Sequence, residues 1–365
     1  MIPQRQVFTL PSYTTTNGRT LKDVRVGFET YGTLNAARDN AILVCHYFSG
    51  TAHAAGRYQE SDPLPGWWDV AIGSGKAIDT DRYFVISSDS LCCLKVFDGH
   101  VVTTGPASIN PDTGKPYGLD FPVISVADMV HVQKALIDHL GIKQLVAVAG
   151  PSAGSVKSVQ WAVEYPEMVK RVIAVICPGL QLTAYGRTVV DAWCVPIRLD
   201  PAWKNGAYDL KEQPIKGMNE TFRQTFLSAI SPAWLERMFG GGWADSALDP
   251  ALSIDHQFKA FTGIGALGAM SSPLCDANHV LYMARAAAIY NAKPKIGQAR
   301  AKFLFIPAES DLLSLPSCSE EAVKTIRAAG GRAELFTLKG DGGHFDGLNL
   351  IDQAREVIQN FLATD

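Results

Sequence analysis

The chain has 365 residues, of which 47% are hydrophobic, so it can bury a large core. Its formal net charge of −3 and isoelectric point near 6.2 give no basic surface of the kind that binds nucleic acid. No apolar run reaches the ~18 residues that cross a bilayer, and no basic segment followed by an apolar one opens the chain, so we expect a cytoplasmic protein without membrane contacts.

The cysteines and histidines indicate no disulfide framework and no metal. Seven cysteines are an odd number, which argues against complete pairing. The adjacent Cys92 and Cys93 have no C-x-x-C partner elsewhere, so we interpret them as buried or loop thiols. His46 and His53 lie close in sequence, but no carboxylate cluster accompanies them. We therefore predict neither a metal nor a bound cofactor.

Strand-like and helical patterns alternate along the first half of the chain. Apolar runs typical of buried strands occur at residues 25–31, 41–44, 83–87, 145–149 and 172–176. Helical spacing occurs between them, as in residues 126–140. This alternation predicts an α/β fold in which a mostly parallel sheet carries helices on both faces.

The strand pattern fades after residue 180 and returns near residue 302. Helical spacing over 221–229, 232–238 and 280–290 predicts an inserted helical lid. An apolar strand at 302–307, a helix at 320–329 and a strand at 333–338 then resume the α/β pattern. We therefore divide the chain into a core in two parts, 1–180 and 296–365, with a lid at 181–295.

The segment Gly150-Pro151-Ser152-Ala153-Gly154 has the G-x-S-x-G pattern. Its position between a strand-like run and a helical one is typical of a nucleophile elbow, in which a serine occupies a sharp turn. Small neighbours let the backbones pass closely there. The alternative is an ordinary glycine-rich turn, and an acid and a histidine in the right order would decide between them.

Both residue types follow in that order. Asp311 lies in the turn after the strand at 302–307, and His344 lies in the glycine-rich loop after the strand at 333–338. Serine, acid, histidine is the order of an α/β-hydrolase triad. The histidine would take the proton of Ser152, and the acid would orient the imidazole. Three other acids remain candidates: Glu309, Asp341 and Asp346.

The same scheme requires two backbone N–H donors for an oxyanion. One would be Ala153, directly after the nucleophile. The other would come from the loop after the strand at 41–45, supplied by Phe48 or, as an alternative, Tyr47. We interpret the neighbouring His46 as a packing or supporting residue.

The chain resembles the homoserine O-acetyltransferase family of α/β hydrolases. The matching segments are residues 28–35, 52–56, 65–69, 73–84, 105–111 and 114–118. The resemblance implies an acyl-enzyme on Ser152, with Asp311, His344 and the N–H groups of Phe48 and Ala153 in the roles above. It also implies transfer of acetyl from acetyl-CoA to homoserine, and a homodimer that pairs through the lid helices.

The chain departs from the family where the amino-acid acceptor would bind. Cys194 stands where the family has a carboxylate-binding arginine, and Phe345 separates His344 from the aspartate that directly follows the histidine in the family. The lid around 256–261 and the loop at 91–106 also differ. We expect a pocket suited to an apolar alcohol, lined by Tyr47, Trp193, Cys194 and Phe345.

Three functions follow in order of preference. The first is a serine esterase that acts on small-molecule, short-chain acetyl esters with water as the acceptor. The alternative is an O-acetyltransferase that moves acetyl from acetyl-CoA to homoserine or another hydroxyl. The third is a non-catalytic binding protein built on a hydrolase scaffold.

Overall fold

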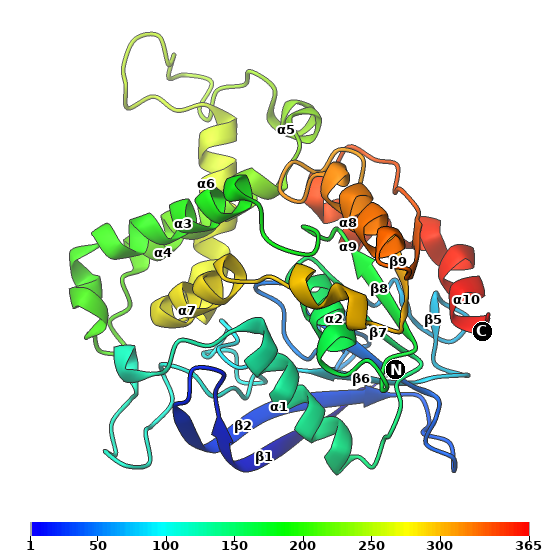
Figure 1. Cartoon of the computed structure of the whole chain (residues 1–365). Coiled ribbons are helices and arrows are strands. Elements are labelled where there is room, and N and C mark those ends of the chain that lie inside the picture. Colours follow the sequence, from blue (N-terminus) through cyan, green and yellow to red (C-terminus); the bar gives the residue numbers. More distant parts are fainter. Residues whose placement is uncertain (1, 365) are drawn as a thin grey trace.

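A computed structural model describes residues 2–364, and its centre is an eight-stranded sheet (Figure 1). The strand order is β1-β2-β6-β3-β7-β8-β9-β10. The bounds are β1 Gln4–Thr14, β2 Thr20–Tyr31, β3 Ala41–Cys45, β6 Phe84–Ser88, β7 Ala147–Pro151, β8 Arg171–Val175, β9 Lys302–Ile306 and β10 Arg332–Leu335. β1 and β2 are antiparallel to their neighbours and the other strands are parallel, so the predicted mostly parallel sheet is confirmed. A separate small pair joins β4 Ile72–Gly73 to β5 Ile78–Asp79.

The antiparallel edge of the sheet is longer than the sequence pattern indicates. The strand expected at 25–31 is the second part of β2, whereas β1 and the first part of β2 precede it, and β1 and β2 together form a long hairpin. β1 is mostly exposed or half-buried and the first part of β2 is largely exposed, so their many polar positions conceal the strand pattern.

Helices cover both faces of the sheet, and each face has its own apolar layer. Along β8, Val172 and Ala174 belong to one layer while Ile173 belongs to the other. Both faces are therefore buried, which explains why the parallel strands are continuous apolar runs. The helices of the core are α1 Val126–His139, α2 Ala153–Glu164, α8 Pro316–Ala328, α9 Asp346–Asn349 and α10 Arg355–Ala363. Short 3-10 helices lie at Gly118–Asp120, Gly343–Phe345 and Ile351–Ala354.

The chain between β8 and β9 is helical and lies to one side of the sheet (Figure 1). It contains α3 Ala184–Leu199, α4 Ile215–Ala229, α5 Pro232–Phe239, α6 Lys259–Ser271 and α7 Ala277–Ala288. Short 3-10 helices at Pro201–Gly206, Ser272–Leu274 and Lys293–Gln298 connect them. α3 packs against α4 and α7, and α4 packs against α6. The sequence patterns missed α3 and α6. None of the described helices is long and apolar enough to cross a membrane.

Two glycines allow the start of α2 to approach the end of β3. A Cβ atom on Gly150 or Gly154 would overlap the backbone carbonyl oxygen of Cys45. Backbone atoms at the end of a central strand cannot move aside without breaking the sheet. The turn between β7 and α2 therefore tolerates no side chain at these two positions.

This contact predicts opposite effects for two glycine-to-alanine substitutions in helices. Gly154→Ala should lower the free energy of unfolding by about 1–3 kcal/mol, because the new methyl group overpacks the backbone of Cys45. Gly265→Ala in α6 is the matched control: nothing lies within 4 Å of its Cβ position, so better helix propensity should raise stability by up to ~1 kcal/mol. Urea unfolding measures both. Equal effects of the two changes would show that the close approach is not a constraint.

Candidate active site

Ser152 lies at the junction of β7 and α2 in a strained backbone conformation. Its φ of 55° and ψ of −121° are rare for a residue with a side chain. Two hydrogen bonds hold the turn: the Ser152 N–H donates to the Val175 carbonyl (2.9 Å), and the Ser155 hydroxyl donates to the Ser152 carbonyl (2.5 Å). Strain of this kind persists only where the surroundings fix it, and it is concentrated at functional sites.

The structure brings together the three side chains predicted as a triad. His344 Nε2 lies 2.8 Å from Ser152 Oγ, and His344 Nδ1 lies 2.6 Å from Asp311 Oδ2. Because an ionised carboxylate only accepts hydrogen bonds, Nδ1 carries the proton and Nε2 is free to accept from the serine. The other oxygen of Asp311 accepts from the N–H groups of Leu313 and Ser314, both at 2.9 Å. The acid, the imidazole and the hydroxyl are thus aligned.

The other three acids have different partners. Glu309 bonds to Lys339, Asp341 pairs with Arg237, and Asp346 accepts from Ser310 and from the Gly342 N–H. Of the four candidates, Asp311 is the one that bonds to His344.

Two backbone N–H groups beside Ser152 are without protein acceptors in the described chain. They belong to Phe48, in the loop after β3, and to Ala153, the first residue of α2. N–H groups in the first helical turn have no partner within the helix and are available to an anion. Both residues also line the space around the serine.

A hydrogen-bonded chain of buried side chains lies beneath the loop that carries Phe48. His46 Nδ1 lies 2.7 Å from the Tyr47 carbonyl oxygen, and His46 Nε2 lies 2.9 Å from Ser90 Oγ. Burial, followed by the nearby charge of Lys157, lowers the pKa of His46 well below its usual value, so the ring is neutral. His46 therefore has a supporting role, as the sequence suggested, but its partners could not be predicted.

Lys157 is the residue that the sequence analysis missed. It lies on α2, its side chain is 2% exposed, and its Nζ donates to Ser90 Oγ at 2.8 Å. Burial lowers the pKa of Lys157 to about 8. The available signal was a lysine within an otherwise apolar helix face directly after the elbow.

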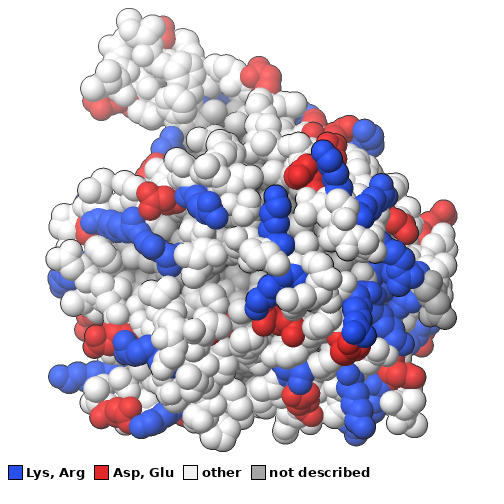
Figure 2. Space-filling model, viewed as in Figure 1, with Lys and Arg blue, Asp and Glu red and all other residues white. Residues whose placement is uncertain are grey.

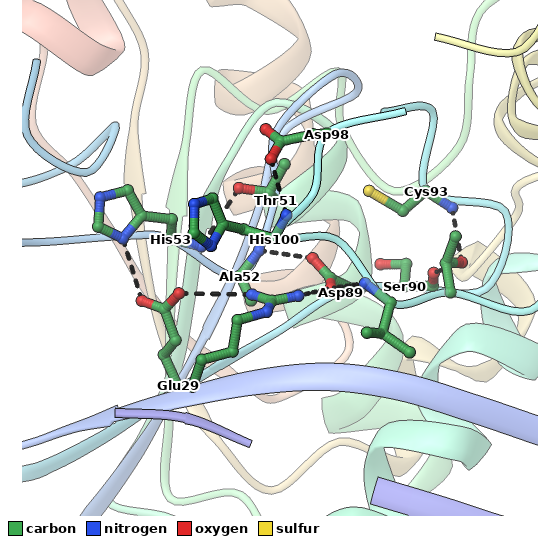
Figure 3. A network of polar contacts seen from close by, with 12 residues as sticks. Glu29, Thr51, Ala52, His53, Asp89, Ser90, Cys93, Asp98 and His100 are labelled. Atoms are coloured by element: carbon green, nitrogen blue, oxygen red, sulfur yellow. Dashed lines mark hydrogen bonds and ion pairs between the residues drawn. The ribbon is translucent and has the colours of Figure 1, made fainter. Parts of the chain in front are cut away.

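Carboxylates hold the neighbouring loops in place (Figure 3). Glu29 accepts from His53 at 3.1 Å, and Asp89 accepts from the Ala52 N–H at 2.8 Å. Arg5 from β1 reaches both carboxylates. Burial would raise the pKa of Glu29, but hydrogen bonds from His53, Tyr58 and Tyr31 lower it below its usual range. The antiparallel edge thus anchors the loop that follows Phe48.

Two cavities meet at Ser152, and Phe48, Trp193 and Leu313 line both of them. The first cavity is lined mainly by apolar residues of α1, α2, α3 and α7, among them Met129, Val156, Val190 and Met283, and also by Lys157. The second is lined by Tyr47, Lys95, Phe222, Phe226, His344 and Phe345, among others. The predicted pocket residues Tyr47, Trp193 and Phe345 therefore face the site.

The prediction for Cys194 is wrong. Its side chain lines a recess on another side of α3, with Arg187, Arg198 and Arg285, and its thiol bonds to the Val190 carbonyl. Successive helical residues point about 100° apart, so Cys194 cannot share the direction of Trp193. Among the residues described, no arginine and no Asp or Glu lines either cavity at Ser152.

The chain is similar to proteins of known name over nearly its whole length. No protein-family model matches the chain. A homoserine O-acetyltransferase from Methanosphaerula palustris is 39% identical over 358 residues, which cover 95% of this chain and 70% of that protein. The crystal structure of homoserine O-acetyltransferase from Bacillus anthracis is 39% identical with a TM-score of 0.95 and covers 100% of this chain and 99% of that one. The crystal structure of esterase E22 is 42% identical with a TM-score of 0.94 and covers 99% of this chain and 100% of that one.

The buried ammonium of Lys157 predicts a pH-dependent stability difference. Its pKa falls from 10.5 to about 8 on folding, so below pH 8 the charge destabilises the native state by roughly 3 kcal/mol. Between pH 8 and 10.5 the unfolded chain binds more protons, so this penalty disappears as the pH rises. Lys157→Met should therefore be more stable than the wild type at pH 7, with a smaller difference at pH 9.5. Urea unfolding at both pH values tests this, and a pH-independent difference would contradict it.

Proposed function

Because the chain belongs to the homoserine O-acetyltransferase family of α/β hydrolases, we propose that it is an enzyme that transfers an acyl group through an ester formed on Ser152. The observation that carries this proposal is the alignment of Ser152, His344 and Asp311 at 2.8 and 2.6 Å. A serine hydroxyl becomes a good nucleophile only when a base accepts its proton. The same alignment argues against a non-catalytic binding protein.

The geometry assigns a step to each group. His344 Nε2 takes the proton as Ser152 Oγ attacks the acyl carbon, and Asp311 stabilises the imidazolium that forms. The N–H groups of Phe48 and Ala153 stabilise the negative charge on the acyl oxygen. His344 then donates its proton to the leaving group, and the acceptor repeats the sequence in reverse to release the acyl group.

The two cavities divide the substrate between them. Since the leaving group must receive a proton from His344, it occupies the second cavity, which His344 lines. The acyl chain then enters the first cavity, beside Ala153 and Val156. That cavity is mainly apolar, which suits a short uncharged acyl group.

The relatives and the cavity lining favour different acceptors. The names of the relatives support acetyl transfer to homoserine, our alternative in the sequence analysis, better than ester hydrolysis. Lys95 in the second cavity supports the same function, because its ammonium can bind a carboxylate. Transfer to homoserine or another hydroxyl is therefore one candidate.

Hydrolysis of short-chain esters is the candidate that the site chemistry favours. Homoserine carries an ammonium as well as a carboxylate, and no described acidic residue lines the second cavity to bind that ammonium. Phe345 and Phe226 stack there with ring centres 5.9 Å apart and present an apolar wall. The structure of esterase E22 is closely similar to that of this chain. We therefore propose water as the acceptor, with a small apolar alcohol as the leaving group.

We also propose that two copies of the chain pair through the segment that projects around α5 and α6. This segment is largely uncharged on the face shown in Figure 2 and exposes apolar side chains, among them Met238, Leu252, Ile254, Phe261 and Met270. Exposed apolar surface of this kind is typical of protein interfaces. Sedimentation of the full chain should show a dimer that Ile254→Asp weakens, and a monomeric wild type would contradict the proposal.

The fate of the acyl group distinguishes the two acceptors. The enzyme is incubated with a short alkyl acetate, and separately with acetyl-CoA and homoserine, while free acetate and O-acetylhomoserine are quantified by mass spectrometry. We expect acetate from the ester and no saturable dependence on homoserine. Rapid formation of acetylhomoserine would instead support the transferase, with Lys95 as the first residue to substitute.

The Ser152→Ala variant is the control for both reactions. It should lose more than ~10³ of kcat, because no acyl-enzyme can form. Retained turnover would contradict the proposed nucleophile. A series of acetate, butyrate and hexanoate esters of one alcohol then tests the first cavity. Because the alcohol is constant, the kcat/KM of the wild type should change with acyl length alone.

A further inference from the structure

The buried chain of side chains beneath Phe48 has a fixed direction. Lys157 has donors and no acceptor when it is charged, so Ser90 Oγ accepts from Nζ and turns its own hydrogen elsewhere. His46 Nε2 lies 2.9 Å from Ser90 Oγ and 3.2 Å from Ser90 N. A backbone N–H can only donate, so Nε2 is an acceptor and Nδ1 carries the proton.

This series of hydrogen bonds ends on the peptide group that carries the proposed oxyanion donor. His46 Nδ1 donates to the Tyr47 carbonyl oxygen at 2.7 Å, and the Gly50 N–H donates to the same oxygen at 3.1 Å. That carbonyl and the Phe48 N–H belong to one planar trans peptide, in which they point in opposite directions. Donors that hold the oxygen therefore also aim the N–H toward Ser152.

Hydrogen bonds to the oxygen also strengthen the N–H as a donor. Each member of a hydrogen-bonded chain polarises the next, and the effect is larger in a buried site than in water. Lys157 supplies a positive charge at the start of this chain. Its polarisation reaches the Phe48 N–H through Ser90, His46 and the Tyr47 carbonyl.

Lys157 lines part of the first cavity, but among the described residues its one side-chain hydrogen-bond partner is Ser90, and no carboxylate pairs with it. Asp89 is the buried acid whose charge acts on it, but Asp89 is paired with Arg5. The thiols of Cys45 and Cys93 also face it, and burial raises the pKa of both, so they remain neutral. An apolar side chain at this position of α2 would pack without the penalty of a buried charge.

We propose that Lys157 is a positioning residue for acyl transfer, which acts through Ser90 and His46 on the Tyr47–Phe48 peptide to aim and polarise the Phe48 N–H. The inference rests on the proposed function of Ser152 and adds a residue outside the triad. The Phe48 N–H stabilises negative charge that develops only in the transition state. Its support by Lys157 therefore affects kcat rather than substrate binding.

The test compares Lys157→Met, Ser90→Ala and the double variant with the wild type in ester hydrolysis. Loss of a direct oxyanion donor costs ~10²–10³ in kcat, so loss of its support should lower kcat about tenfold, with KM within about twofold. The double variant should lose about as much as either single variant, because both interrupt one chain. Ser158→Ala is the control, since Ser158 is buried on the same helix and bonds to the Gly154 carbonyl and the Cys45 thiol, outside the Lys157–Ser90–His46 series.

A second readout separates this role from a merely structural one. Ser152 Oγ adds to the carbonyl carbon of a short-chain trifluoromethyl ketone, its proton passes to His344 Nε2, and the carbonyl oxygen becomes an anion that faces the Phe48 N–H. The affinity of this ketone for Lys157→Met should fall about tenfold, in parallel with kcat, while thermal stability at pH 7 does not fall.

Two outcomes would overturn the inference. One is an unchanged kcat in both single variants, and the other is a loss of kcat that accompanies an equal rise in KM and a lower melting temperature. Ser152→Ala keeps the two proposals apart. If Ser152→Ala is inactive and Lys157→Met is fully active, the positioning role fails and the acyl-enzyme stands; if Ser152→Ala retains activity, the proposed function itself fails.

Discussion

The contact between the start of α2 and the end of β3 determines the geometry of the site. Because Gly150 and Gly154 have no side chain, the turn that carries Ser152 lies directly against the Cys45 carbonyl. The next residues after Cys45 form the loop with His46 and Phe48. The serine, the first N–H of α2 and the N–H of Phe48 are therefore neighbours as a consequence of one backbone approach. The positive φ of Ser152 is the local cost of that approach, and the hydrogen bond to Val175 in the adjacent strand maintains it.

The sequence could predict the triad because each member follows a strand. Parallel strands end at one edge of a sheet, so residues after β7 and β9 and after the strand pattern at 333–338 must meet there. The acid was less certain, since four carboxylates follow those strands, and only the hydrogen bonds of the folded chain single out Asp311. The mostly parallel sheet could be predicted for a related reason: strands buried on both faces are continuous apolar runs, whereas the half-exposed hairpin of β1 and β2 is not.

Residues on helices were harder to predict than residues after strands. Cys194 was assigned to the pocket because it stands where the family has a carboxylate-binding arginine, but a helix turns neighbouring side chains in different directions, and only packing decides which one faces the serine. Lys157 was missed for the opposite reason, because a lysine is ordinarily assigned to solvent. Its burial depends on Ser90 and His46, which come from two other segments of the chain. No local pattern contains such a three-part arrangement.

The site combines a largely apolar cavity lining, in which Lys95 and Lys157 are the lysines among the described residues, with a strongly polar support. Two charges close to Ser152 act on its neighbours: Asp311 stabilises the imidazolium, and Lys157 acts on the peptide that faces the oxyanion. Apart from Lys95, the second cavity offers an acceptor or leaving group no ionised partner among the described residues. Charge is therefore arranged for the transition state rather than for the ground state of a zwitterionic acceptor. A substrate with both an ammonium and a carboxylate would lose its hydration there and regain at most one ion pair, whereas a neutral ester loses little. This asymmetry is the physical basis of our proposal that the substrate is an uncharged ester, on a fold shared with acyl-transferring relatives.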